Sequence, residues 1–280
     1  MNRQPVVAGQ FYEEDKEKLK KQLETCFSSS FGPGKLEKKT NKEIKAVIVP
    51  HAGYFFSGAC AAHAYKKIFE SGFSGTIILI GPNHFGYGTG LSVLDWETPL
   101  GIMKTDKELA EKIKQNTNLK IAEHCHREEH SLEVQIPFLQ YIENKIKIVA
   151  IVLGSETDYK KLAKDLKKVL KNKKIIYVVS SDFTHYGLNY NYVPFMTDIK
   201  ENLKKLDMGA IDKIINLDAK GFGEYIFDKK ITICGYMGIL LLLEILGKNP
   251  TKTTLLKYYT SSDVMGDFRN SVSYASILFK

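Results

Sequence analysis

The sequence contains little cysteine and no long apolar run. Four of the 280 residues are cysteine, and no two of them form a CxxC pair. The longest apolar run, residues 236–246, contains Glu244 and is far shorter than the roughly 20 residues that a membrane helix needs. The first residues do not resemble a secretory signal either. We therefore expect a cytoplasmic protein with reduced cysteines and no membrane segment.

Interleaved basic and aromatic residues, which a nucleic-acid platform requires, are also missing. The net charge is +8, but the lysines fall in patterns such as KKLAKDLKKVLK at 160–171. Such a pattern is typical of the solvated face of an amphipathic helix. We therefore expect no nucleic-acid partner.

Short apolar runs, bounded by turn residues, dominate what is present. Four of them predict buried strands at 46–49, 76–80, 146–153 and 175–179. Segments with helical spacing lie between or before them, at 15–27, 57–69 and 158–170. Two further predicted strands, 254–260 and 272–279, follow one another directly, as antiparallel strands do. We expect one three-layer α/β/α domain over residues 1–280, with a mostly parallel sheet and an antiparallel edge.

Short strands are also predicted at 92–94 and 102–104, and three local features complete the predicted elements. Residues 5–12 show no regular pattern. Thr105 to Glu108 has the spacing of a capping box that opens a helix. Section 198–227 is predicted to be helical, with breaks at 216–218 and at 221–223.

Ionisable residues follow three of the predicted buried strands. His51 follows the first, His84 the second, and Asp182 with His185 the strand at 175–179. Ligands of open α/β sheets bind beyond the carboxyl ends of the strands, so these side chains should converge. Two neutral imidazoles with one anionic ligand would hold a transition metal and leave positions for substrate or water. The alternative for any one of them is a polar residue in a sharp turn.

The anionic ligand has two candidates on this interpretation, Asp182 and Cys234. A carboxylate would favour Fe(II) or Mn, whereas a thiolate shifts the preference towards zinc, copper or iron. Cys234 precedes an apolar helix, and a buried cysteine is often only a small apolar residue. Spacing leaves both candidates open.

The segment with His126, Glu129 and His130 fits the H-x-x-E-H pattern of inverted zinc proteases. That pattern needs a helix that presents both histidines on one face, and this run resembles a loop or a first helical turn. We therefore do not favour a protease. Glu129 and His130 either reach the site as a proton-transfer pair or form a polar helix start, where Glu129 suits the helix dipole. His63 lies in an alanine-rich helix and is interpreted as structural.

Three residues flank the candidate ligands and could hydrogen-bond a substrate. Tyr54 follows His51, Asn83 precedes His84, and Tyr186 follows His185. Tyrosines near strand ends are also common core residues, so packing is the alternative for Tyr54 and Tyr186.

At these residues the sequence resembles the Memo family, over nearly the whole chain. The matching stretches, in chain order, are AGQFY at 8–12, PHAGY at 50–54, GACAAHAYK at 58–66, GPNH at 81–84, EEHSLE at 128–133, VSSDFTHYG at 179–187, TICG at 232–235 and NSVSYA at 270–275. Their order and number make the resemblance specific.

The resemblance implies an α/β fold related to that of the class III extradiol ring-cleaving dioxygenases, which hold non-haem iron. It also implies that His51, His84 and Cys234 correspond to the metal-binding residues, with Asp182 and His185 beside them. Animal members of the family are linked to receptor-tyrosine-kinase signalling, cell motility and copper or iron redox chemistry. Microbial members are associated with an AMMECR1-like protein and a radical-SAM enzyme, which are therefore expected partners.

The sequence departs from the animal members at two positions beside the site. Phe85 stands where a second histidine is expected, and Tyr186 stands where tryptophan is expected. These changes bear on whether the metal and the substrate are the same as in those members.

The sequence therefore predicts a metal-dependent redox enzyme that acts on a small molecule or a peptide. Iron is the first expectation for the single metal ion, with copper and zinc as alternatives. His185 would act as acid or base, Asp182 would orient it, and Glu129 would contact the substrate or serve His130. Two other functions stay open: a non-catalytic protein that binds a peptide or a phosphorylated ligand, and a metal-assisted hydrolase.

Overall fold

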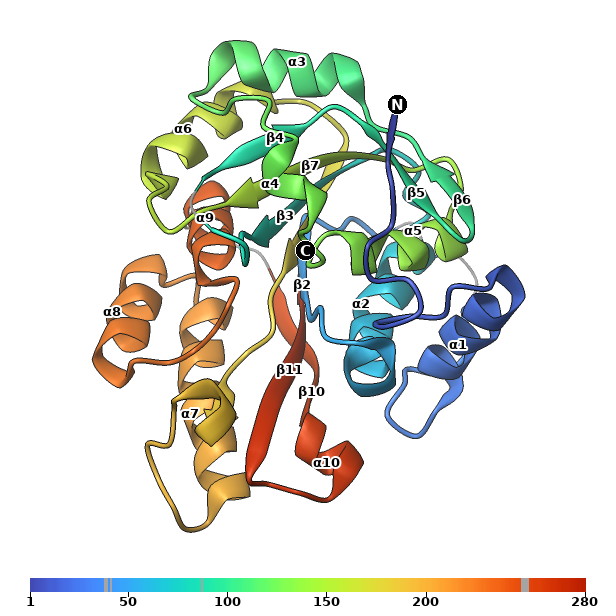
Figure 1. The fold of residues 1–280 in the computed structure, drawn as a ribbon. Helices are drawn as coiled ribbons and strands as arrows, with labels where there is room; N and C mark the ends of the chain where they lie inside the picture. Colours follow the sequence, from blue (N-terminus) through green and yellow to red (C-terminus); the bar gives the residue numbers. More distant parts are fainter. Residues whose placement is uncertain (38–39, 41, 87, 248–251) are drawn as a thin grey trace.

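The computed structural model describes residues 1–280 except 38–39, 41, 87 and 248–251. Its elements form a central sheet with helices on both faces (Figure 1). No helix in these described ranges is long and apolar enough to cross a membrane.

The central sheet is parallel in the middle and antiparallel at both edges. Its strands run in the order β10, β11, β2, β8, β3, β7 and β4. The parallel core consists of β2 (Ala46–Val49), β8 (Ile175–Ser180), β3 (Thr76–Pro82) and β7 (Lys147–Leu153). The antiparallel strands are β10 (Thr253–Thr260), β11 (Asn270–Phe279), β4 (Gly90–Ser92) and the short β9 (His185–Gly187), which pairs with β11. The predicted parallel sheet with an antiparallel edge is confirmed.

Helices cover both faces of the sheet. Because alternate residues of each strand point to opposite faces, each strand contributes side chains to both cores. On β8, Tyr177 and Val179 join one apolar core, and Ile176 and Val178 join the other. The first core contains the helices α3 (Lys107–Asn116), α6 (Tyr159–Val169), α7 (Ile199–Ile215), α8 (Ala219–Lys229) and α9 (Tyr236–Leu246). The second contains α1 (Lys16–Ser28), α2 (Ala59–Glu70) and α5 (Ile136–Ile142). These are the three expected layers.

A second sheet of three strands was not predicted. It joins β1 (Asn2–Arg3), β5 (Asp95–Thr98) and β6 (Gly101–Met103), so the start of the chain pairs with a segment more than 90 residues away. The strands have two to four residues each, too few for a periodic pattern to show, and only β6 overlaps a predicted strand, the one at 102–104.

Local predictions needed three corrections. The expected break at 221–223 is absent, because Asp218 caps α8 through the amide of Gly221 and the helix continues through both glycines. Asp106, not Thr105, caps α3, because the Thr105 hydroxyl donates to the carbonyl of Leu94 instead. The helix predicted at 57–69 begins as an α-helix only at Ala59, because a π-helical turn (Tyr54–Gly58) precedes α2.

The remaining short helices connect the larger elements. They are α4 (His124–Arg127), α10 (Ser261–Met265) and the 3₁₀ turns Glu133–Gln135 and Leu188–Tyr190.

The order of the parallel strands determines where the site forms. β8 lies between β2 and β3, so the segments that follow these three strands leave the same edge of the sheet side by side. His51, His84 and Asp182 are the residues that this arrangement brings to one place.

Candidate metal site

His51 lies two residues beyond β2, and its ring is almost completely buried. Its Nδ1 lies 2.9 Å from the hydroxyl oxygen of Ser180, the last residue of β8. That hydroxyl donates its single proton to the carbonyl of Ser131 at 2.6 Å, so Nδ1 must be the donor in the contact with His51. The lone pair of the neutral ring is therefore on Nε2.

His84 follows β3 and is oriented by a buried carboxylate. Its Nδ1 lies 3.0 Å from Oε1 of Glu129, and its backbone amide donates to Oε2 at 2.7 Å. Burial would raise the pKa of Glu129, but hydrogen bonds from His84 and Ser131 prevail and lower it to about 2. The ionised carboxylate accepts from Nδ1, which again leaves the lone pair on Nε2.

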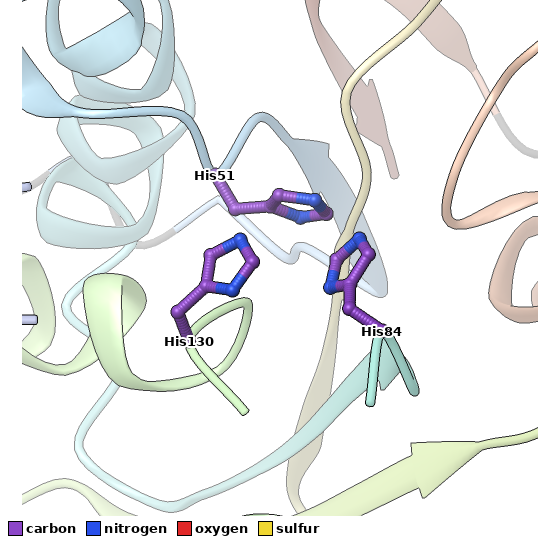
Figure 2. A group of neighbouring side chains, drawn as sticks. All are labelled: His51, His84 and His130. Atoms are coloured by element: carbon purple, nitrogen blue, oxygen red, sulfur yellow. The ribbon is translucent and has the colours of Figure 1, made fainter. Parts of the chain in front are cut away.

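His130 completes a group of three imidazoles (Figure 2). Its ring stacks on that of His84, with 4.7 Å between centroids, and lies 5.6 Å from that of His51. One ligand atom from each residue lies within 4.8 Å of those of the other two. Burial lowers the pKa of His51, and it lowers that of His130 to about 4. Both rings are therefore neutral at pH 7, as metal ligands must be.

Asp182 holds the turn that carries His51. Its Oδ1 accepts from the amide of His51 at 2.7 Å and from that of Ala52 at 3.3 Å. Burial raises the pKa of this carboxyl, and the nearby His185 opposes the rise. Asp182 therefore contacts the backbone of the site, and its predicted role in orienting His185 stays a prediction.

His185 lies at the start of β9, beyond β8. Its Nδ1 is 3.0 Å from the carbonyl of Thr232, and a carbonyl can only accept, so Nδ1 carries the proton. The amide of His185 donates to the Thr232 hydroxyl at 2.9 Å, and the ring faces Tyr190 at 5.1 Å. Nε2 is thus the basic atom of a well-fixed ring.

Cys234 lies just before α9 and contacts His51. Its Sγ is 3.1 Å from Nε2 of His51 and accepts from the amide of Asp182 at 3.3 Å. Gly235 lets the chain after Cys234 pack closely against Ser181, because a Cβ at position 235 would lie 2.5 Å from the Cβ of Ser181. Burial, with the adjacent Asp182, raises the pKa of the thiol, so the sulfur is protonated in the metal-free protein. Cys234 lies outside the group of three mutually close histidines.

The three predicted substrate contacts serve the local structure. Tyr54 is buried and donates to the carbonyl of Val134 at 2.6 Å. Tyr186 is also buried and donates to the carbonyl of Phe195 at 2.7 Å. Asn83 shapes the loop after β3 by donating to the carbonyl of Gly88 at 3.0 Å. Their role in substrate binding stays a prediction.

The zinc-protease arrangement is not formed. Helix α4 has only four residues, and the Nε2 of His126 donates to the carbonyl of Gly90 at 3.1 Å while its ring lies against Trp96. His126 is therefore committed to Gly90 and is not one of the three close imidazoles. His63 contacts the carbonyl of Phe31 at 3.0 Å, as expected of a structural histidine.

The polar network behind His51 was not predicted from the sequence. Gln135 donates to the hydroxyl of Ser180 and to the carbonyl of Pro50, both at 2.9 Å, and accepts from Tyr65 at 2.7 Å. Gln135 and these three partners are all buried. The double serine at 180–181, at the end of an apolar strand, was the one available signal.

Known proteins are similar in sequence to this chain over nearly its full length. The profile of the Memo-like protein family matches residues 3–278. MEMO1 family proteins from Methanobrevibacter smithii and Nitrosopumilus maritimus are each 39% identical, with all of both chains covered. One from Sulfurisphaera tokodaii is 38% identical and covers all of this chain and 99% of its own. The chain therefore belongs to the Memo-like protein family.

Proposed function

We propose that this protein binds one transition metal ion at the histidine group and uses it in a redox reaction. The observation that carries the proposal is the approach of His51, His84 and His130, which come from three separate segments of the chain. Histidines that only occupy separate turns would not be expected to bring their ring nitrogens this close together.

The hydrogen bonds of two of the rings also fit a metal site. Metal-binding histidines usually donate the second ring N–H to a carboxylate, a carbonyl or another acceptor, which fixes the ring. His51 does so to Ser180, and His84 does so to Glu129. Both rings thus offer Nε2 without a change of tautomer.

The third protein ligand has two candidates. His130 is favoured by its distance to the other two imidazoles. Cys234 is favoured by the family resemblance and by its contact of 3.1 Å with Nε2 of His51. A metal would lower the pKa of the thiol and convert it to a thiolate ligand.

A bound metal would supply Lewis-acid and electron-transfer chemistry at positions that the protein leaves open. The chain itself would supply the proton transfers. His185 can accept a proton at Nε2 because Nδ1 is committed to the carbonyl of Thr232. Asp182 would keep His51 in place through the two amides that it accepts.

The metal and the substrate are parts of the proposal. Iron is the first candidate, with copper next. Zinc is supported by the all-nitrogen set of three histidines, which also occurs in zinc enzymes that activate water. That donor set makes a metal-assisted hydrolase the second candidate function. A small molecule or a peptide is the proposed substrate, and an AMMECR1-like protein and a radical-SAM enzyme are proposed partners.

An oxygen-uptake screen separates these functions. Protein reconstituted anaerobically with Fe²⁺, Cu²⁺ or Zn²⁺ is tested with phenolic metabolites and peptides, and the zinc form also with esters and amides. A redox enzyme predicts metal-dependent oxygen uptake that His185→Gln lowers by roughly 10²-fold, the usual contribution of an acid–base group. Ester cleavage by the zinc form alone would indicate the hydrolase. Ligand binding without turnover, and independent of metal, would contradict the proposal.

A further inference from the structure

Hydrogen bonds and an ion pair join the first residues of the chain to segment 126–133, which contains Glu129 and His130. Arg3 donates from Nε to the carbonyl of His126 at 3.1 Å and from Nη2 to that of Glu129 at 2.8 Å. Its Nη1 forms a buried ion pair with Glu133. Arg3 thus holds the backbone of the residue that orients His84.

Glu133 in turn fixes the next part of the N-terminal segment. Its carboxylate accepts from the amides of Val6 at 2.9 Å and Val7 at 3.0 Å, and from the hydroxyl of Tyr12 at 2.7 Å. The side chain is fully buried, so water does not compete with these donors for its carboxylate oxygens. Residues 6–12 therefore have a defined path although they form no helix or long strand.

Phe11 brings this path against the metal site. Its ring lies 4.8 Å from that of His130, between centroids, at 58°. Its carbonyl accepts from the amide of Tyr54 at 2.7 Å, in the turn that follows His51. One residue of the N-terminal segment thus contacts the segments of two of the three histidines. Figure 1 shows the segment, in dark blue, running from the N-terminus beside β5, with which β1 pairs, and then on to α1.

We propose that residues 3–12 form a wall of the metal site, in which Phe11 positions the ring of His130 and Arg3 positions Glu129. The inference rests on the proposed function as a metal-binding protein. It gives a physical role to the AGQFY stretch at 8–12, which no ligand or acid–base assignment explains. Neither Phe11 nor Arg3 touches the metal in this arrangement, so both are positioning residues.

Substitution of Phe11 tests the proposal with Co²⁺ as the probe. Phe11 is only half-buried, so Phe11→Ala should fold. We expect its Co²⁺ affinity to fall about 10-fold, as for other residues that orient ligands, and its visible Co²⁺ spectrum to change. Phe11→Tyr keeps the ring and should restore both. Phe55→Ala is the matched control, because this exposed ring lies beside the same turn and packs on Phe56.

The outcomes are separable from those of the proposed function. If Phe11→Ala binds Co²⁺ with wild-type affinity and spectrum, or if Phe55→Ala loses as much, the positioning role is wrong. If the wild-type protein does not bind Co²⁺, or if His51→Ala binds it equally well, the proposed metal site itself is wrong.

Discussion

Glu129 shows how one buried side chain prepares a ligand. It accepts hydrogen bonds from the ring and the amide of His84 and from the amide of Ser131, so both carboxylate oxygens have donors. Removal of that negative charge should weaken the hydrogen bonds that orient His84, while every candidate metal-ligating atom stays in the site. The low pKa of Glu129 links this role to a measurable dependence of stability on pH.

Glu129→Gln is predicted to destabilise the metal-free protein in a pH-dependent way. The folded-state pKa of Glu129 is about 2, below its ordinary value of 4.5, so the ionised form stabilises the fold. This contribution is complete above about pH 5 and is lost as the pH falls from 4.5 towards 2. At pH 7 the loss should be about 1.5–3 kcal/mol, the range for hydrogen bonds to a charged group.

Urea unfolding of both proteins between pH 7 and pH 3 measures this difference. The exposed neighbour Glu128, changed to Gln, serves as the control and should behave like wild type at every pH. A difference between wild type and Glu129→Gln that does not shrink below pH 4.5 would show that the carboxylate is not stabilised as the contacts suggest.

At the scale of elements, β1 and the segment after it are held by side chains more than by backbone pairing. β1 has two residues, and Arg3 within it joins Glu133 at a site where neither group reaches water. A buried ion pair is costly to break on one side, because the remaining charge has no partner.

Arg3→Ala should therefore lower the free energy of unfolding by about 3–5 kcal/mol, since it leaves the carboxylate of Glu133 buried without its cation. Arg269→Ala is the matched control, because Arg269 pairs with Asp267 on the surface. Urea unfolding midpoints compare the two variants. Equal, small effects would mean that water or a rearranged side chain replaces Arg3.

The elements differ in how far the sequence could predict them. β2, β3, β7 and β8 are continuous apolar runs, and burial on both faces requires such runs, so the parallel core was predictable. The small sheet was not, because β1 and β5 are too short to show a period, and the short strand predicted at 102–104 overlaps β6 alone. The path of residues 6–12 depends on Glu133, a distant side chain that no local pattern reveals.

At the scale of the whole molecule, the site depends on the order of the strands. The sequence showed that His51 and His84 each follow a buried strand, and the sheet rule then predicted their convergence. It could not show that β8 lies between those strands, or that segment 116–135 returns to place His130 on His84. Such placement results from tertiary packing, which local periodicity does not encode.

A metal that joins three distant segments should stabilise the whole fold, because the ligands are close together only in the folded chain. Thermal unfolding with and without Zn²⁺ or anaerobic Fe²⁺ tests this claim most directly. At a free metal concentration about 100 times the dissociation constant, the melting temperature of the wild type should rise by about 5 °C or more. His51→Ala and His84→Ala should abolish the rise. His63→Ala, which changes a histidine outside the site, should retain it.

The same measurement on His130→Ala and Cys234→Ser identifies the third ligand, since the variant that loses the rise has lost a donor atom. We predict a metal-dependent rise in melting temperature that requires both His51 and His84. No rise in the wild type, or an equal rise in His51→Ala, would contradict the proposed metal site.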